Sequence, residues 1–489
     1  MIWTATDLIN ATGGQLLNGN DASGALDWAV SGMALDNRKT KTGDLFIAIK
    51  GEHHDGHDYA AASVEAGAVA ALVSTPVAIN TPQILVADTL AALEQLATEA
   101  RRRSQAQIIA ITGSVGKTGT KHIMASCLAA LGPTHASEGN YNNHIGAPLS
   151  LALMPQPSAY GVFELGMNHS GEIAALSPMV APHIAVITRI SNSHGGFFDS
   201  LDDIAAAKAE IFTGLMDGGI AVLNADDPYA GYLSDQARCH GASRVITCGF
   251  AETATARLIQ VTRHDHGLAI SATINGQAID FSIKMNAPHW ALSAVMALAV
   301  VDALHPNDNA ALKAAAQAMA GLEDLAGRGK RHTATFENGH QIKVIDDSYN
   351  ASPASMASAL IALGQDPEHG RRVAILADML ELGDEADQLH RDLITALTEA
   401  SPALLICFGA SMAHLAKAYH DTNPDAIIHH CRDAHDAVAA ALPLLQDGDL
   451  VLVKGSNGMK TSHVVSALRA ASSGASTEQN TIQGGHHAA

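Results

Sequence analysis

Short apolar runs alternate with helical patterns along most of the chain. From about residue 83 to about residue 326, several strand-like runs each lead through a loop into a helix, among them IIAIT, AYGVFELG, HIAVITRI and GIAVLNADDP. This alternation predicts a mostly parallel sheet with helices on both faces. A second series begins after AGRGKRH and contains HQIKVIDDSYN, RRVAILADML, ALLICFG, AIIHHC and LVLVKGSNG. The pattern therefore predicts an α/β protein with two doubly wound units.

The two ends of the chain follow other patterns. Residues 1–82 combine short strand-like runs such as LFIAI with the polar loop KGEHHDGHDY and an alanine-rich helix, which predicts a small α/β domain. We therefore expect three domains, at residues 1–82, 83–326 and 327–473. Residues 474–489 show no periodicity and have little apolar surface to bury, so they are predicted to form a disordered tail.

Composition and charge narrow the classes of partner. The chain has 489 residues and a formal net charge of −20, which argues against nucleic acid or an anionic membrane surface as a partner. Its first residues lack a basic segment followed by an apolar one, and no stretch of about twenty residues is apolar enough to span a bilayer. We expect a cytoplasmic monomer that binds small molecules. The five scattered cysteines form no C-x-x-C pair, so reduced thiols are expected.

A glycine-rich turn joins the strand at residues 108–111 to a helix. Backbone N–H groups that converge in such a turn, together with a lysine and the positive end of a helix dipole, bind phosphate. The usual G-x-x-x-x-G-K-[ST] pattern fails at its first glycine, where Ile111 stands, and a shorter form remains. A glycine turn that binds no phosphate is the alternative. The Thr118 hydroxyl is the predicted ligand of the nucleotide's Mg²⁺. The predicted phosphate-binding residues are Gly113, Ser114, Val115, Gly116, Lys117 and Thr118.

Two polar residues follow the next two predicted strands. Ligands of open parallel sheets bind beyond the carboxyl ends of the strands, so these positions are candidates for a site. Glu164 follows Val162 and Phe163, and its carboxylate is predicted to reach a cation on the neighbouring phosphates. An exposed glutamate at a strand end is the alternative. His194 follows HIAVITRI, and a solvated loop histidine is the alternative there.

Lys208 stands on the apolar side of the predicted helix SLDDIAAAKAEIFTGL. The helix opens with Ser200 and Asp203 at capping-box spacing. Lys208 lies four residues after Ile204 and three before Ile211, which places all three side chains on one face. A lysine there either extends to the helix edge or enters a site where its charge is neutralised or modified. Spacing alone leaves both interpretations open.

The second doubly wound unit also has polar residues at a strand end. Asp347, Tyr349 and Asn350 follow the apolar part of HQIKVIDDSYN. Arg328 lies in a Gly-Arg-Gly segment at a predicted domain junction, where an arginine either contacts a phosphate or serves only as a linker residue. Lys454 opens the turn KGSNGMK, which is a weaker match to an anion-binding loop.

Several segments, in the same order, resemble the Mur ligase family of ATP-dependent amide-forming enzymes in cell-wall precursor synthesis. The resemblance covers nearly all of residues 1–470, and the phosphate loop resembles the family's shortened one. The early segment DNRKTKTGDLFIAIKGEHHDGHDY is similar to the family's uridine-nucleotide domain. The segments most specific to one kind of member are GNYNNHIGAPLSL, FELGMNHSGEI, IDDSYNASPASM, LADMLELG and VLVKGSNGMK.

The resemblance implies a fold and a reaction. The implied domains are a small α/β N-terminal domain for the UDP-sugar, a central parallel-sheet ATP-binding domain, and a C-terminal Rossmann-like α/β domain for the incoming dipeptide. The implied reaction joins D-alanyl-D-alanine to UDP-N-acetylmuramoyl-tripeptide through an acyl phosphate, with ATP and Mg²⁺. A sister ligase that adds the third amino acid and a folate polyglutamate ligase are close alternatives. An alternative from another class is a phosphate-loop ATPase or kinase that forms no amide.

The resemblance also implies a role for each candidate residue. Lys117, His194, Lys208 and Arg328 are the implied catalytic residues. Thr118 and Glu164 would bind the first Mg²⁺, while His194 and Lys208 would belong to a second metal region, with Lys208 carbamylated by CO₂. The other implied contacts are Lys117 and Arg328 with phosphates, Asn224 and His289 with adenine, Asp347 with ribose, and Asp36, Asn37, Arg38, Asn142, Asn143, Tyr349 and Asn350 with the substrates.

The chain departs from the family pattern at a few positions. Threonine is usual where Gly119 stands, and serine where Asn37 stands. Glycine and asparagine are usual where Ala287 and Ser293 flank His289. These departures bear mainly on the adenine side of the implied site.

Overall fold

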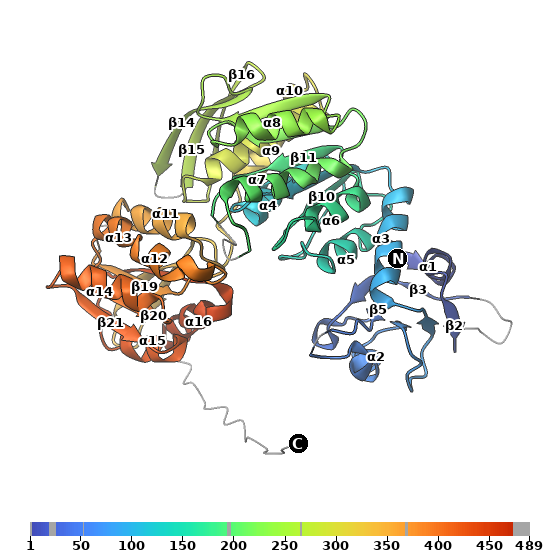
Figure 1. The fold of residues 1–489 in the computed structure, drawn as a ribbon, viewed down its shortest axis with the longest axis horizontal. Coiled ribbons are helices and arrows are strands. Elements are labelled where there is room, and N and C mark those ends of the chain that lie inside the picture. The colour runs from blue at the N-terminus through green and yellow to red at the C-terminus, as the bar shows by residue number, and fades with distance from the viewer. Residues whose placement is uncertain are drawn as a thin grey trace. The chain divides into compact units, whose positions relative to one another are not determined.

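The computed structural model describes residues 2–18, 26–51, 53–192, 197–264, 267–366 and 370–472, which form two compact units (Figure 1). The first unit comprises Met1–Ile190, Ser200–Lys284 and Pro288–Leu322, and the second comprises Ser191–Asp199, Met285–Ala287 and Glu323–Ala489. The tail predicted at 474–489 lies outside the described residues. Three main sheets give the chain the three-part α/β architecture that its sequence predicts.

The first sheet lies near the N-terminus of the first unit. It has five strands in the order β2-β7-β6-β5-β4, parallel from β4 to β7 and antiparallel at β2. Buried strand residues such as Leu45 and Ile84 form one apolar cluster with Leu93 and Leu96 of helix α3. The elements are β1 (Trp3–Thr4), α1 (Ala5–Thr12), β2 (Gln15–Leu17), β3 (Ala29–Val30), β4 (Gly32–Ala34), η1 (Asn37–Lys39), β5 (Asp44–Ile47), η2 (Gly56–Tyr59), α2 (Ala60–Glu65), β6 (Ala70–Val73), β7 (Gln83–Leu85) and α3 (Thr89–Arg103).

The central sheet has nine strands in the order β16-β15-β14-β13-β12-β11-β8-β10-β9. Neighbouring strands from β9 to β14 are parallel, as predicted, whereas β14, β15 and β16 pair antiparallel and extend one edge of the sheet. The sequence pattern alone does not distinguish that antiparallel extension from the parallel series. The strands are β8 (Gln107–Thr112), β9 (Thr134–Ala136), β10 (Tyr160–Glu164), β11 (Ile184–Ile187), β12 (Ile220–Asn224), β13 (Arg244–Gly249), β14 (Ala256–His264), β15 (Gly267–Ile274) and β16 (Gln277–Ile283).

Helices cover the central sheet (Figure 1). Helix α4 buries the face that its sequence predicts, since Ile123, Met124, Cys127 and Leu128 are all fully buried. Helix α9 is buried nearly all round, as expected for a helix between a sheet and other helices. The helices are α4 (Lys117–Ala129), α5 (Gly146–Ala152), α6 (Glu172–Val180), α7 (Leu201–Ala209), η3 (Glu210–Gly214), α8 (Ala230–Cys239), α9 (Trp290–Leu304) and α10 (Asn309–Met319).

The second unit contains a six-stranded sheet in the order β17-β18-β22-β19-β20-β21, parallel except for the β17–β18 pair. Separate apolar clusters cover its two faces, which confirms the predicted doubly wound arrangement. Its elements are β17 (Lys330–Thr335), β18 (Gln341–Asp347), α11 (Pro353–Gly364), β19 (Arg372–Ala377), η4 (Gly383–Glu385), α12 (Ala386–Arg391), α13 (Ile394–Ala400), β20 (Leu404–Phe408), α14 (Met412–Thr422), β21 (Ile427–Cys431), α15 (Ala434–Ala441), β22 (Leu450–Lys454), η5 (Asn457–Met459) and α16 (Thr461–Ser472).

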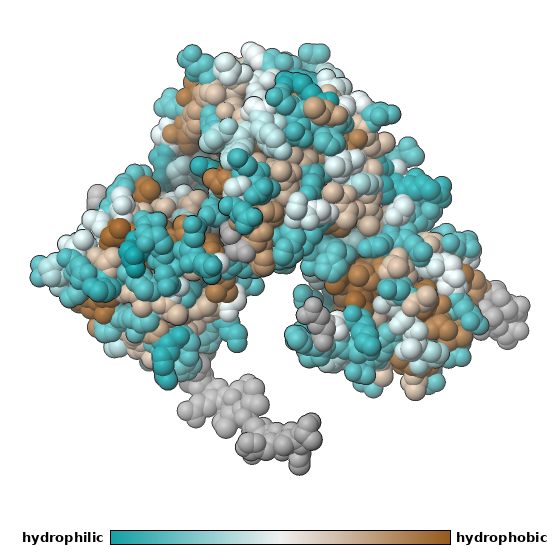
Figure 2. All heavy atoms as spheres, viewed as in Figure 1, coloured by the Kyte–Doolittle hydropathy of each residue, from teal (hydrophilic) through white to brown (hydrophobic). Residues whose placement is uncertain are grey.

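The surface seen in Figure 2 mixes hydrophilic residues with smaller hydrophobic areas. Among the described residues, no helix combines the length and apolar character needed to cross a membrane. All five cysteines are free thiols, as predicted, and Cys127, Cys248 and Cys407 are buried.

Helices α4 and α9 contact each other at a position where the sequence departs from the pattern that it resembles. A side chain at Gly119 would run into the ring of Trp290, which is only 2% exposed. One residue further on, the Thr120 hydroxyl donates to Ser293 Oγ at 2.9 Å, and both groups are buried. Two of the departures therefore lie in one helix contact, where Gly119 faces the Trp290 ring and Ser293 binds Thr120.

We expect Gly119→Thr to destabilise the protein because the Trp290 ring cannot move aside without disturbing the core. Overpacking of this kind costs about 1–3 kcal/mol, and thermal unfolding would measure it. In a Trp290→Ala background the same substitution should cost clearly less, as a double-mutant cycle would report.

Gly231→Thr is a matched control, because Gly231 lies in helix α8 and a Cβ there meets nothing within 4 Å. Its effect should stay within about 0.5 kcal/mol. An equal cost of Gly119→Thr in both backgrounds would show that the ring is not the obstacle.

Candidate functional site

The glycine-rich loop follows β8 at the switch point of the central sheet, where β8 lies between β10 on one side and β11 on the other. Gly113 and Gly116 have φ values of +142° and +85°, which side-chain-bearing residues rarely adopt. The end of β11 supports the loop. Thr188 Oγ1 donates to the Val115 carbonyl at 2.6 Å, and the Ser114 N–H donates to the Arg189 carbonyl at 2.7 Å. Contacts within the protein therefore support the backbone of the loop.

Lys117 opens helix α4 directly after the loop. Its Nζ donates to the Gly113 carbonyl at 2.6 Å and lies 3.3 Å from the Ser114 carbonyl. The ammonium therefore lies within the glycine-rich loop. The positive end of the α4 dipole points to the same loop. A loop carbonyl is a partner that a phosphate oxygen can replace.

Glu164 ends β10 and is only 1% exposed. Its Oε2 accepts from the Thr118 hydroxyl at 2.8 Å, and its Oε1 accepts from Asn142 Nδ2 at 2.7 Å. Lys121 Nζ lies 3.3 Å from Oε2. Burial alone would raise the pKa of the Glu164 carboxyl, but the charges of Lys121 and Lys117 and these hydrogen bonds outweigh it and lower the pKa. An ionised carboxylate beside a hydroxyl is suited to a hard divalent cation.

The side chain of Lys208 is fully buried. No group among the described residues accepts a hydrogen bond from its Nζ. Burial, aided by the charge of Lys117, lowers the pKa of the Lys208 amine well below its ordinary value, and the carboxylates of Glu210 and Glu164 only partly offset this. The lysine therefore does not extend to the helix edge, and burial disfavours the charged form of its amine.

The helix that carries Lys208 differs in detail from the prediction. It ends at Ala209 and continues as the 3-10 turn η3. Ser200 caps it by accepting from the Asp203 N–H at 3.2 Å, but the Asp203 carboxylate accepts from the Ser200 hydroxyl instead of from the Ser200 N–H. The reciprocal capping box is therefore incomplete, because the hydroxyl takes the place that the backbone donor would have.

His194 lies outside the described residues, so its predicted role stays a prediction. Within the described residues, no group of three or more His, Cys, Asp or Glu side chains is placed to hold a metal ion. Mg²⁺ is commonly held by one or two protein oxygens together with substrate phosphates and water. The Thr118–Glu164 pair has the character of such a partial site.

The two residues predicted near adenine lie at the end of β12 and at the start of α9. Asn224 ends β12, is 5% exposed, and its Oδ1 accepts from the Asp226 N–H at 3.0 Å. His289 is exposed at the start of α9, with its ring centroid 4.3 Å from that of Trp290.

The predicted substrate residues of the first unit fall in two places. In the N-terminal sheet region, Arg38 Nη2 lies 2.7 Å from Asp36 Oδ2, and this contact lowers the pKa of Asp36 to about 2, while Asn37 begins η1. In the loop between β9 and α5, Asn142 binds Glu164, whereas the Oδ1 of Asn143 accepts from the Gly146 N–H at 2.8 Å. The structure thus joins Asn142, but not Asp36 to Arg38, to the phosphate-loop network.

The second unit gathers its own polar group at the carboxyl ends of β18 and β22. Asp347 and Lys454 are register partners, with Nζ 2.7 Å from Asp347 Oδ2, and Lys454 also donates to the Asn350 carbonyl at 3.0 Å. The Arg328 guanidinium lies over the Tyr349 ring at 4.1 Å. Four predicted residues, Arg328, Asp347, Tyr349 and Asn350, therefore take part in three contacts, two of them with Lys454. Lys454 was singled out only weakly, because its carboxylate partner lies about a hundred residues away in sequence.

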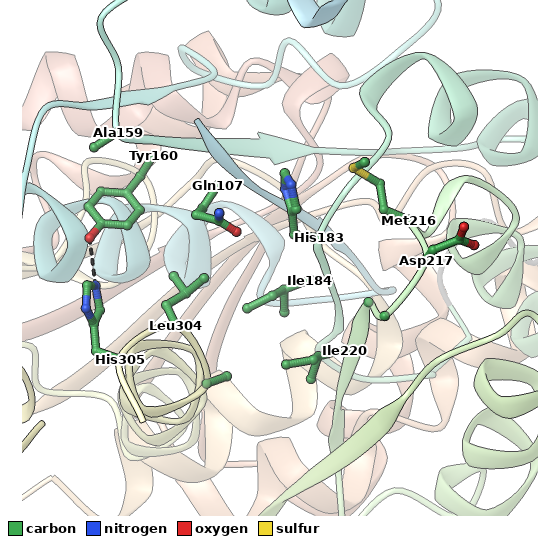
Figure 3. Close-up of a pocket in the computed structure, with 13 residues that line it drawn as sticks. Gln107, Ala159, Tyr160, His183, Ile184, Met216, Asp217, Ile220, Leu304 and His305 are labelled. Atoms are coloured by element: carbon green, nitrogen blue, oxygen red, sulfur yellow. Dashed lines mark hydrogen bonds between the residues drawn. The ribbon is translucent and has the colours of Figure 1, made fainter. Parts of the chain in front are cut away.

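A cavity of about 340 Å³ lies elsewhere on the central sheet (Figure 3). Gln107, Tyr160, Ile184 and Ile220 line it, and these residues begin β8, β10, β11 and β12. It therefore opens at the amino ends of the strands, opposite to the edge that carries the phosphate loop. Its Tyr160 hydroxyl lies 2.7 Å from His305 Nε2. We assign the site to the carboxyl edge because its polar groups converge there.

Comparisons with known proteins identify the family of the chain. Three domain families match successive parts of the chain: "Mur ligase family, catalytic domain" over residues 29–110, "Mur ligase middle domain" over 111–301, and "Mur ligase, glutamate ligase domain" over 327–457. The chain that carries this glycine-rich loop and the buried Lys208 amine therefore belongs to the Mur ligase family.

Individual relatives match over nearly the full length. A protein of Rickettsia prowazekii named UDP-N-acetylmuramoyl-tripeptide–D-alanyl-D-alanine ligase is 33% identical over 95% of this chain and 99% of its own. A ligase of the same name from Escherichia coli is 34% identical over 93% of this chain and 96% of its own. The crystal structure of MurF from Acinetobacter baumannii has a TM-score of 0.78 at 28% identity, covering 96% of this chain and 99% of that one.

We expect Lys208→Met to stabilise the protein in CO₂-free buffer, because the substitution removes a buried amine that lacks a hydrogen-bond partner among the described residues. Leaving such a group unsatisfied costs roughly 1–3 kcal/mol. Below the ordinary lysine pKa of 10.5 the unfolded chain keeps this amine protonated, whereas burial in the folded chain lowers the pKa and disfavours protonation. Wild-type stability should therefore rise with pH, and the gap to Lys208→Met should shrink toward the ordinary pKa.

Melting temperatures at about pH 7 and about pH 9.5 would measure this gap. Lys313→Met, at an exposed position on α10, is the control and should change neither value. A wild-type protein that melts above Lys208→Met at both pH values would contradict the expectation.

Proposed function

We propose that this chain is an ATP-dependent ligase that joins D-alanyl-D-alanine to UDP-N-acetylmuramoyl-tripeptide, giving ADP, phosphate and the UDP-pentapeptide for peptidoglycan synthesis. The observation that carries this proposal is the fully buried Lys208 amine, within electrostatic reach of Lys117 and Glu164. It occurs in a chain 33% identical over 95% of its length to a ligase of that name. A phosphate-loop ATPase or kinase gives no reason for a buried lysine amine at that position.

We assign one substrate to each part of the chain. Residues 1–82 bind the UDP part of the muramoyl substrate, residues 83–326 bind ATP, and residues 327–473 bind the dipeptide. In the second of these, Asn224 and His289 contact adenine, and in the third, Asp347 contacts ribose. We also propose that the chain acts as a monomer in the cytoplasm, since both acceptor and donor are small water-soluble molecules.

The reaction needs ATP because a carboxylate is already anionic and resists attack by an amine. A terminal carboxylate oxygen of the tripeptide attacks the γ-phosphorus, the bond to ADP breaks, and an acyl phosphate forms. The dipeptide amine then attacks the acyl carbon, the tetrahedral intermediate expels phosphate, and the nitrogen loses a proton. Holding the reactants in near-attack geometry can supply about 7–11 kcal/mol of the barrier.

Cationic side chains allow the two anions to approach. Lys117 exchanges its contact with the Gly113 carbonyl for the β and γ phosphates, and Arg328 contacts the γ-phosphate. A fixed group aimed at developing charge is commonly worth about 3 kcal/mol by mutation. Asp36, Asn37, Arg38, Asn142, Asn143, Tyr349 and Asn350 are the proposed substrate contacts.

The residues around Glu164 fit a divalent cation. Thr118 and Glu164 offer two oxygen ligands, 2.8 Å apart and beside the phosphate loop, and one of them is ionised. Mg²⁺ bound there would neutralise charge on the transferring phosphate. Lys208 fits a metal only after modification. Its neutral nitrogen adds to CO₂, a proton leaves, and the carbamate offers anionic oxygens, with His194 as a further ligand.

Purified protein should release phosphate from ATP only when UDP-N-acetylmuramoyl-tripeptide and D-alanyl-D-alanine are both present, and a UDP-pentapeptide should appear in equal amount. A chelator should abolish both signals, and Mg²⁺ should restore them. Phosphate release without either substrate, or without a new amide, would assign the chain to the ATPase class. Release with a single amino acid in place of the dipeptide would favour a sister ligase.

Lys208→Ala should lower the ligation rate by about 100-fold or more, because it removes an anionic metal ligand. Wild-type protein equilibrated with ¹³C-bicarbonate should show a carbamate carbon resonance that the variant lacks. Lys313→Ala serves as the control and should retain both the rate and the resonance. Full activity of Lys208→Ala would count against the ligase mechanism.

A further inference from the structure

Lys121 is a buried cation to which neither the phosphate loop nor the proposed metal site assigns a role. It lies on α4, one helical turn after Lys117, and only 6% of its side chain is exposed. Its Nζ donates to the Gly139 carbonyl at 2.6 Å and lies 3.3 Å from Glu164 Oε2. Burying a lysine costs several kcal/mol unless it is paired and hydrogen-bonded, so these contacts are what keep it there.

The Gly139 carbonyl belongs to the loop that joins β9 to α5. Glu138, Gly139 and Asn140 are exposed, so their own side chains add little packing that would fix the backbone. The loop is instead held from inside at two points. Lys121 binds the Gly139 carbonyl, and Glu164 binds the Asn142 side chain, whose residue also accepts from the Gly166 N–H at 2.8 Å.

The two anchors share one carboxylate. Lys121 contacts Oε2 of Glu164 and Asn142 contacts Oε1, while Thr118 also binds Oε2. The segment 138–143 is thus tied to the first turn of the phosphate-loop helix through a single buried charge. A change at Lys121 would release Gly139 without removing Thr118 or Asn142 from Glu164.

We propose that Lys121 is a positioning residue that holds the segment 138–143 in the conformation that binds the muramoyl-peptide substrate. This inference rests on the proposed function, since that function identifies Asn142 and Asn143 as substrate contacts. Lys121 touches neither phosphate nor substrate in this role. It acts through the Gly139 carbonyl, so its removal affects binding of the muramoyl substrate more than binding of nucleotide.

The test compares wild type, Lys121→Met and the control Lys313→Met, and the titration with the muramoyl substrate is done without ATP and in the presence of a chelator. Calorimetric titration with UDP-N-acetylmuramoyl-tripeptide should show at least about tenfold weaker binding to Lys121→Met. Hydrogen exchange of a peptide covering residues 137–145 should be faster in that variant, and affinity for Mg²⁺–ADP should stay within about twofold. In steady state, KM for the muramoyl substrate should rise more than kcat falls. Lys313→Met should match wild type throughout.

Unchanged exchange and unchanged substrate affinity in Lys121→Met would overturn the proposal. An equal loss of Mg²⁺–ADP affinity would also overturn it, because Lys121 would then act on the phosphate or metal region. If Lys121→Met does not fold, Lys121→Arg replaces it. The planar guanidinium keeps the charge but cannot reproduce the contact of a compact ammonium in this buried space, so faster exchange at 137–145 is still expected. Wild-type protein that neither binds nor ligates the muramoyl substrate would refute the proposed function instead.

Discussion

The ionised carboxylate of Glu164 is the constraint on which the arrangement of the first unit's site depends. A charge almost completely removed from water persists only where other groups replace its hydration. Here a helix supplies a hydroxyl and a lysine, and a loop supplies an amide. Because each of these groups contacts the same carboxylate, the first turns of α4, the end of β10 and the β9–α5 loop have fixed relative positions. The site is therefore organised before any ligand binds.

Lys208 presents the opposite solution to the same problem. Glu164 is compensated from three directions, whereas the Lys208 amine is buried and finds no acceptor among the described residues. A group left in this state costs stability, and proteins retain such costs mainly at functional positions. The buried Glu164 carboxylate and the buried Lys208 amine therefore differ in what their burial achieves. One buried group is satisfied and holds the frame together, and the other is left unsatisfied and remains reactive.

Local sequence patterns predicted the parts of this arrangement that depend on local geometry. The helical spacing of Ile204, Lys208 and Ile211 placed the lysine on a buried face, and the strand–glycine–lysine order placed the phosphate loop. Lys121 and Lys454 were not predicted as site residues, because their partners lie on other segments and no local period records such a contact. For Lys121 a signal did exist, since it follows Lys117 by four residues and so lies on the same side of the helix.

The contact between Gly119 and Trp290 restricts the order in which this chain can change over generations. The ring occupies the space that a side chain at position 119 would need, so a larger residue there becomes acceptable only after the ring has gone. Loss of the ring first leaves a cavity, which a later side chain at 119 can fill. The reverse order passes through a clash. Residues 119 and 290, on separate helices, are therefore expected to change together. A sequence comparison that scores the two positions independently would misjudge both.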